Sequence, residues 1–160
     1  MNRSQVLASC GSLMYSTYMN QAAKAPAADL AILLHAAAAA QDDVEAKLGA
    51  IGLSLAKLAA LKALSAAGES LPLTQLAARL SCVKSNITQL VDRLEADGFV
   101  RRQADPNDRR ARLATLTAAG QRACREGSRV QEAAERNLLG KLSASESRQL
   151  AELLGKIQSG

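Results

Sequence analysis

The segment from Leu80 to Thr117 restricts the possible folds of this chain more than any other part of the sequence. It begins with a break at 81–83, continues with a helix-forming segment from about Lys84 to Ala96, stops at Gly98, and ends in two strand-forming segments around a charged turn. A short helix that begins at Pro72 precedes the break. Four apolar residues of the longer helical segment recur at i, i+3, i+4 and i+7 and must face a core: Ile87, Leu90, Val91 and Leu94. This order predicts a winged helix-turn-helix, which is a helix-turn-helix followed by a two-stranded β-hairpin.

The rest of the chain has the composition of packed helices. Alanine and leucine supply most of the hydrophobic residues, which make up 48% of the chain, whereas aromatic residues make up 2%. This composition favours helices over a β-sandwich, and 160 residues suffice for one domain with its own core. We therefore expect a mainly α fold with a small β-wing. Start and stop signals predict further helices at about 29–48, 54–68, 118–139 and 143–158, with Gly127 and Gly140 bending or breaking the third of these.

Residues 1–28 come before the first of these helices, and we expect them to form a partly disordered arm. They lack the apolar core segment of a signal peptide, and no run of about 18 apolar residues predicts a membrane span. The three cysteines, Cys10, Cys82 and Cys124, lack metal or redox spacing, which indicates reduced thiols in the cytoplasm. We expect no metal, no cofactor and no enzymatic activity, because neither a Ser/His/Asp arrangement nor a phosphate-binding loop is visible.

The helix predicted at about 84–96 has a polar side opposite its apolar stripe. Its short hydrogen-bonding and charged side chains are Ser85, Asn86, Thr88, Gln89, Asp92 and Arg93. In a helix-turn-helix, the N-terminal half of the second helix reaches the base edges, and Asn and Gln can pair with adenine in bidentate fashion. The alternative interpretation is an ordinary solvated helix face.

The hairpin that follows is strongly basic. Between Phe99 and Arg112 there are five arginines and two aspartates, which gives a local net charge of +3 in a chain of net charge +5. Such a tip is attracted to phosphates, and arginine also suits a narrow minor groove. The alternative is a mixed-charge surface turn.

With these residues placed, the chain resembles the MarR family of bacterial transcriptional regulators. The resemblance runs from about Asp29 to the C-terminus and is carried by four segments: GLSLAKLAAL, LAARLSCVKSNITQLVDRLEADGFVRR, DPNDRRARLATLTAAG and LSASESRQLAELLGKI. The third is the most specific, because Asp-Pro-x-Asp-Arg-Arg is followed there by a Leu-Thr-x-x-Gly helix start. The resemblance implies a symmetric homodimer, with dimerisation helices at about 29–48 and 118–158 and a winged helix-turn-helix at about 54–117.

The resemblance also implies roles for individual residues in binding double-stranded DNA. The recognition helix would start near Lys84 and contact bases or nearby phosphates through Ser85, Asn86, Thr88 and Gln89. At the wing tip, Arg110 would enter the minor groove, and Asp108 would orient the wing arginines through a salt bridge. Arg93 and Arg109 would make supporting contacts.

Two residues in the break depart from the family pattern. Val83 stands where the family usually has a small hydroxyl residue that caps the recognition helix, a cap worth about 1 kcal/mol. Cys82 occupies a normally aliphatic position. It is either a small buried hydrophobe or a redox switch, because a thiol near a helix N-terminus can have a lowered pKa.

The leading hypothesis is a dimeric, sequence-specific DNA-binding regulator, a repressor that a small-molecule effector releases from a palindromic operator. An apolar stripe near the C-terminus suits pairing with an identical chain: Leu150, Leu153, Leu154 and Ile157. The resemblance implies an effector, but the sequence does not identify it. Two alternatives stay open, namely a thiol-based regulator that uses Cys82 and a winged-helix module for protein interaction.

Overall fold

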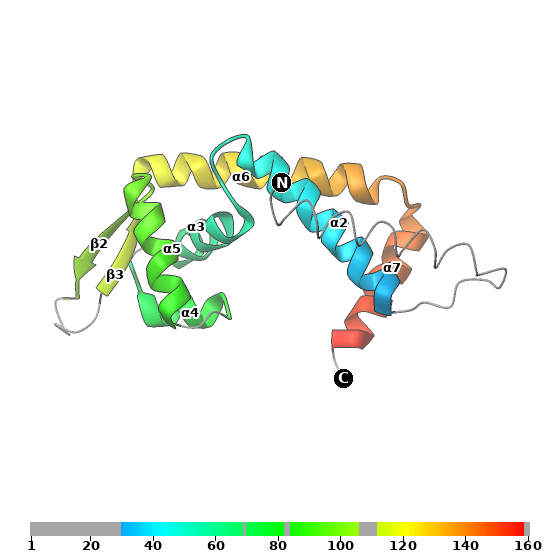
Figure 1. Ribbon diagram of the computed structural model, residues 1–160, viewed down its shortest axis with the longest axis horizontal. Coiled ribbons are helices and arrows are strands. Elements are labelled where there is room, and N and C mark those ends of the chain that lie inside the picture. The colour runs from blue at the N-terminus through cyan, green and yellow to red at the C-terminus, as the bar shows by residue number, and fades with distance from the viewer. Residues whose placement is uncertain (1–29, 69, 82–83, 106–111, 159–160) are drawn as a thin grey trace, which may run out of the picture. The chain divides into compact units, whose positions relative to one another are not determined.

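The computed structural model describes residues 30–68, 70–81, 84–105 and 112–158, and it is mainly helical with a small sheet (Figure 1). The N-terminal arm therefore lies outside the described residues. The elements, in chain order, are α2 (Leu30–Gly49), α3 (Leu55–Ala67), β1 (Leu71–Pro72), α4 (Leu73–Arg79), α5 (Lys84–Ala96), β2 (Val100–Ala104), β3 (Arg112–Leu116), α6 (Ala118–Leu139) and α7 (Ala144–Gln158). The chain divides into two compact units, residues 1–39 and 40–160. This architecture confirms the predicted mainly α fold with a β-wing.

The helix boundaries agree with the sequence prediction because local capping interactions fix them. The Ser54 hydroxyl accepts a hydrogen bond from the Lys57 N–H at 3.1 Å and begins α3, and Gly68 ends that helix at a φ of 78°. Before α7, the Ser143 N–H donates to the Glu146 carboxylate at 2.7 Å, while the Glu146 N–H donates back to the Ser143 hydroxyl at 3.3 Å. These two bonds form the predicted capping box.

The core of the unit that begins at Ala40 lies between the helices and the sheet. Helix α3 is its centre, because it contacts α4, α5, α6 and β3. The largest fully buried side chains are Leu48, Leu58, Leu61, Leu64, Leu76, Ile87, Val91 and Leu94. Burial of each of these side chains contributes about 1.5–3 kcal/mol, so the core holds α4 and α5 in the helix-turn-helix arrangement.

The sheet has three antiparallel strands in the order β1-β3-β2. Strands β2 and β3 form the predicted hairpin, with Val100 opposite Leu116 and Ala104 opposite Arg112. A third strand, which the sequence analysis did not predict, joins the hairpin, because β1 pairs Leu71 with Ala114. A strand of two residues is too short to show an alternating pattern, and the proline in it is tolerated at a sheet edge.

Helix α6 continues through Gly127, so this glycine, which was expected to bend or break the helix, does not break it; the helix ends at Leu139, with Gly140 as its C-cap. Gly127 is buried, and a Cβ there would lie 2.7 Å from Leu53 Cδ1 and 2.8 Å from Leu58 Cδ1. The glycine therefore permits the close packing of α6 against the start of α3.

The start of α6 is joined to the hairpin by one compact set of backbone contacts. The Thr117 N–H donates to the Phe99 carbonyl at 3.0 Å, and the Thr117 hydroxyl donates to the Gly98 carbonyl at 2.7 Å. The same hydroxyl accepts from the Gly120 N–H at 3.0 Å and caps the helix. A Cβ on Gly120 would lie 2.0 Å from the Phe99 carbonyl oxygen, so a side chain at position 120 would collide with the backbone.

Candidate nucleic-acid interface

Helix α5 has one buried and one exposed face, as its sequence pattern predicted. Ile87, Val91 and Leu94 are completely buried. The exposed residues on the described part of the helix include Asn86, Thr88, Gln89, Asp92 and Arg93. The backbone of Lys84 and Ser85 belongs to α5, whereas their side chains lie outside the described part of the structure. A polar surface of this kind is available to a ligand, because the opposite face fixes the helix to the core.

The turn between α4 and α5 is tight. Helix α4 ends at Arg79 with Leu80 as its C-cap, and Ser81 then adopts a φ of 51°, which few residues other than glycine adopt. The Ser81 N–H still donates to the Ala78 carbonyl, at 3.2 Å. Cys82 and Val83 lie outside the described residues, so the redox interpretation of Cys82 and the missing cap at Val83 remain predictions.

The described part of the wing ends at residue 105 and resumes at residue 112. Asp108, Arg109 and Arg110 fall in the interval that is not described, so their assigned roles also remain predictions. Figure 1 shows β2 and β3 beside α5, and of the two strands β2 makes the contacts with the helix while β3 pairs with β2. Strand β2 leads into this interval and β3 leads out of it.

One arginine of the hairpin has a role that the sequence prediction missed. Its backbone N–H donates to Glu95 Oε1 at 2.9 Å, and its Nε donates to Glu95 Oε2 at 2.7 Å. The residue is Arg102, and its guanidinium also forms ion pairs of 2.5 Å with Asp92 Oδ1 and with Glu95 Oε2. These hydrogen bonds lower the pKa of Glu95, and they raise the pKa of Arg102.

The pairing adds a partner to two residues whose charges the sequence analysis counted without one. Arg102 was counted with the phosphate-attracting charge of the hairpin, and Asp92 was counted with the polar face of α5. A signal for the contact does exist, because Arg102 is two residues from the buried Val100 and thus shares its face of the strand. Asp92 and Glu95, three residues apart, lie on neighbouring turns of the helix that this strand contacts.

A second ion pair supports the far end of α5. Lys57 Nζ lies 2.7 Å from Asp97 Oδ2, and it also donates to the Gly52 carbonyl at 3.3 Å. The lysine therefore ties the start of α3 to the residue that follows α5. In this way α5 is fixed by its apolar face, by the strand and by α3.

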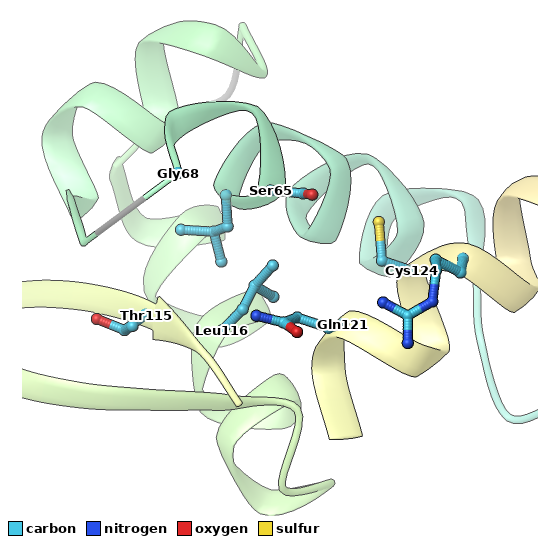
Figure 2. A pocket seen from close by; sticks show the side chains of 8 residues that line it. Ser65, Gly68, Thr115, Leu116, Gln121 and Cys124 are labelled. Atoms are coloured by element: carbon cyan, nitrogen blue, oxygen red, sulfur yellow. The ribbon is translucent and has the colours of Figure 1, made fainter. Parts of the chain in front are cut away.

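A pocket of about 210 Å³ lies between the end of α3, strand β3 and the first half of α6 (Figure 2). Its lining residues are Leu64, Ser65, Gly68, Thr115, Leu116, Gln121, Cys124 and Arg125. Ser65 and Cys124 face each other across the space between the two helices (Figure 2). Burial raises the pKa of the Cys124 thiol, an effect that the nearby Lys62 opposes. The pocket thus places leucine side chains beside several polar and charged groups, Ser65, Thr115, Gln121 and Arg125 among them.

Within the described residues, no group of His, Cys, Asp and Glu is arranged to hold a metal ion. The same part of the chain contains no helix with the length and apolar character needed to cross a bilayer.

The fold and the exposed face of α5 define a winged helix-turn-helix protein. Comparison with known proteins agrees with this class and identifies a family within it. A sequence model of the MarR family matches residues 53–111. The HTH-type transcriptional repressor Rv2887 of Mycobacterium tuberculosis is 31% identical over 128 residues, which cover 80% of this chain and 91% of the relative.

Two solved structures resemble the fold closely. A probable transcriptional regulator from Pseudomonas aeruginosa has a TM-score of 0.70 and 29% identity, covering 79% of this chain and 93% of its own. A MarR mutant from Escherichia coli complexed with operator DNA has a TM-score of 0.71 and 24% identity, covering 79% and 90%.

The chain belongs to the MarR family of winged helix-turn-helix transcriptional regulators. This membership confirms the predicted class of protein, a regulator of transcription rather than an enzyme.

Proposed function

We propose that this chain is a cytoplasmic repressor that binds a palindromic operator as a homodimer. The observation that carries the proposal is the two-faced burial of α5, where Ile87, Val91 and Leu94 are fully buried on one side and Asn86, Thr88 and Gln89 are exposed on the other. The mycobacterial relative is named a transcriptional repressor, which supports repression rather than activation. The operator complex of the Escherichia coli protein supports the kind of ligand.

In the proposed complex, α5 enters the major groove and the wing reaches the adjacent minor groove. Residues Lys84, Ser85, Asn86, Thr88 and Gln89 contact bases or nearby phosphates. Arg110 inserts into the minor groove, Asp108 orients it, and Arg93 and Arg109 add phosphate contacts. The exposure of Arg93 is compatible with its part.

Binding to a labelled duplex from the promoter of the chain's own gene tests the proposal. We expect specific binding whose affinity falls steeply with salt, by about 0.9 in log K per unit of log salt for each phosphate contact. A scrambled duplex of equal length is the control. If the chain does not bind the duplex even at low salt, the protein-interaction alternative replaces this proposal.

The proposed homodimer is supported by apolar side chains that the single chain leaves exposed. On α7 these are Leu150, Leu153 and Ile157, with exposed fractions of 38%, 50% and 65%. Leu30 and Leu34 on α2 are 68% and 59% exposed. Large apolar side chains gathered on terminal helices indicate an interface with another chain.

We also propose that a small organic effector binds the pocket between α3, β3 and α6. An apolar body would rest on Leu64 and Leu116, and a polar or acidic group would pair with Gln121 and Arg125. Salicylate is a suitable first probe, and we expect it to raise the melting temperature and weaken operator binding. Ser65→Trp should fill the pocket and abolish both effects of the probe while operator binding persists; if both effects remain, the probe acts elsewhere.

Cys82 offers a different mode of release, through oxidation of its thiol. The variant Cys82→Ser separates the two modes, because it removes the thiol and keeps the side chain small. Under oxidant, a wild-type chain that leaves the operator and a Cys82→Ser chain that stays bound would support redox control. Release of both chains would exclude Cys82 as the switch.

A further inference from the structure

Arg102 connects the two elements of the proposed DNA-binding unit that are separated along the chain. It belongs to strand β2, and its two acidic partners, Asp92 and Glu95, belong to helix α5. The backbone N–H of Arg102 and three of its side-chain contacts reach these carboxylates. Two carboxylates hold the planar guanidinium, and a backbone hydrogen bond adds to them. Together these contacts fix the orientation of strand β2 relative to helix α5 as well as the distance between them.

The group is too exposed to serve mainly as a source of stability. The exposed fractions of the side chains are 29% for Arg102, 50% for Asp92 and 35% for Glu95. Single ion pairs at such surfaces contribute about 0–1 kcal/mol. Its geometric effect is larger, because the strand beyond Arg102 has little other burial to hold it: Gln103 and Ala104 are exposed and Asp105 is only partly buried.

The same contacts alter the charge that α5 presents. Without Arg102, Asp92 and Glu95 would place two uncompensated negative charges beside the exposed polar face of the helix. Such charges repel a phosphate backbone. With its guanidinium held by these carboxylates, Arg102 is turned toward the helix, so its charge offsets theirs and is withdrawn from direct contact with DNA.

We propose that Arg102 is a positioning residue: it fixes the wing hairpin against the recognition helix and screens Asp92 and Glu95 without touching DNA. This inference rests on the proposed operator binding. It distinguishes Arg102 from the neighbouring Arg101, which is exposed and for which the described residues supply no ion pair.

The test compares Arg102→Ala with Arg101→Ala on the promoter duplex across a range of salt concentrations. We expect Arg102→Ala to weaken binding at least tenfold while the slope of log K against log salt stays within about 0.3 of the wild-type slope. A lost phosphate contact would reduce the slope by about 0.9. Arg101→Ala removes the same charge from the same strand and should weaken binding less than Arg102→Ala.

Arg102→Lys keeps a positive charge beside Asp92 and Glu95 and should weaken binding less than Arg102→Ala. Hydrogen exchange without DNA supplies a separate measurement, in which Arg102→Ala should speed exchange of the β2 and β3 amides and leave the α3 amides unchanged.

Several results would overturn the inference. These are unchanged affinity of Arg102→Ala, a slope reduced by about 0.9, equal losses for Arg102→Lys and Arg102→Ala, or unchanged hairpin exchange. A wild-type chain that does not bind the duplex would instead overturn the proposed function, and the DNA part of this inference with it.

Discussion

At the scale of single residues, Thr117 explains why the Leu-Thr-x-x-Gly segment is so specific. Its backbone and hydroxyl groups bond to the carbonyls of Phe99 and Gly98 and to the N–H of Gly120. One residue therefore caps α6 and fastens it to the residues between α5 and the wing. Gly120, three positions later, must be a glycine because the Phe99 carbonyl oxygen occupies the space that a side chain at position 120 would need.

We expect Gly120→Ala to destabilise the protein by about 2 kcal/mol or more, because the new Cβ would lie 2.0 Å from the Phe99 oxygen and the backbone must shift. Urea unfolding followed by circular dichroism measures the change. Gly49→Ala is the matched control, since a Cβ at this helical glycine meets nothing within 4 Å. We expect that control to change stability by less than about 1 kcal/mol. Equal effects of the two variants would contradict the close contact.

Two glutamates make the folded state sensitive to acid. Hydrogen bonds from Arg102 lower the pKa of Glu95 below its ordinary value of 4.5, and the Ser143 N–H and hydroxyl do the same for Glu146. A lowered pKa stabilises the fold above the unfolded-state pKa, and this stability is lost as the pH falls through the folded-state value. We therefore expect the free energy of unfolding to decline below about pH 4.5. In urea titrations from pH 7 to pH 3, the free energy of unfolding of Glu146→Gln should decline less than that of the wild-type chain. An identical decline would show that Glu146 does not contribute to the acid sensitivity.

At the scale of elements, the helices were predictable because each one carries its own signals. The period of Ile87, Leu90, Val91 and Leu94 gave the bounds of α5, and Ser54, Thr117 and Ser143 marked helix starts that the structure confirms. Such signals are local, so they can be recognised in the sequence without knowledge of the tertiary structure.

Features that depend on contacts between distant residues were not predictable in the same way. Gly127 resembled a helix breaker, whereas the need for close packing against Leu53 and Leu58 keeps it inside α6. The partners of Arg102 depend on how strand β2 lies against α5, which the charge pattern of the hairpin does not contain. The main residues of the proposed site at the wing tip, Asp108 to Arg110, still rest on the sequence alone.

The proposed role of the wing tip in DNA binding can be tested independently of the Arg102 contacts. We expect Arg110→Ala to weaken operator binding at least tenfold and to reduce the salt slope by up to about 0.9, because the wing tip would lose its DNA contact. The melting temperature should change little. Arg148→Ala removes an equal charge from α7 and should leave operator affinity within about twofold. Near-normal affinity of Arg110→Ala would refute the assignment of the wing tip.

At the scale of the whole molecule, the exposed apolar residues of α7 make the oligomeric state testable. Leu153→Glu places a charge in the proposed interface, and we expect the dimer dissociation constant to rise at least tenfold, which corresponds to about 1.4 kcal/mol. Sedimentation velocity over a concentration series measures the shift.

Arg148→Glu introduces the same carboxylate on the opposite face of α7, as the helical repeat dictates, and should leave the dimer intact. If Leu153→Glu sediments like the wild-type chain, the stripe on α7 is not the interface.

The close approach of Gly120 to Phe99 has a mechanical consequence. Helix α6 and the start of the wing meet through backbone atoms and the Thr117 hydroxyl, with no room for a side chain at position 120. We expect a displacement of the first turn of α6 to move Phe99 at the base of the hairpin as well, because the Thr117 N–H and the Phe99 carbonyl are hydrogen-bonded at 3.0 Å.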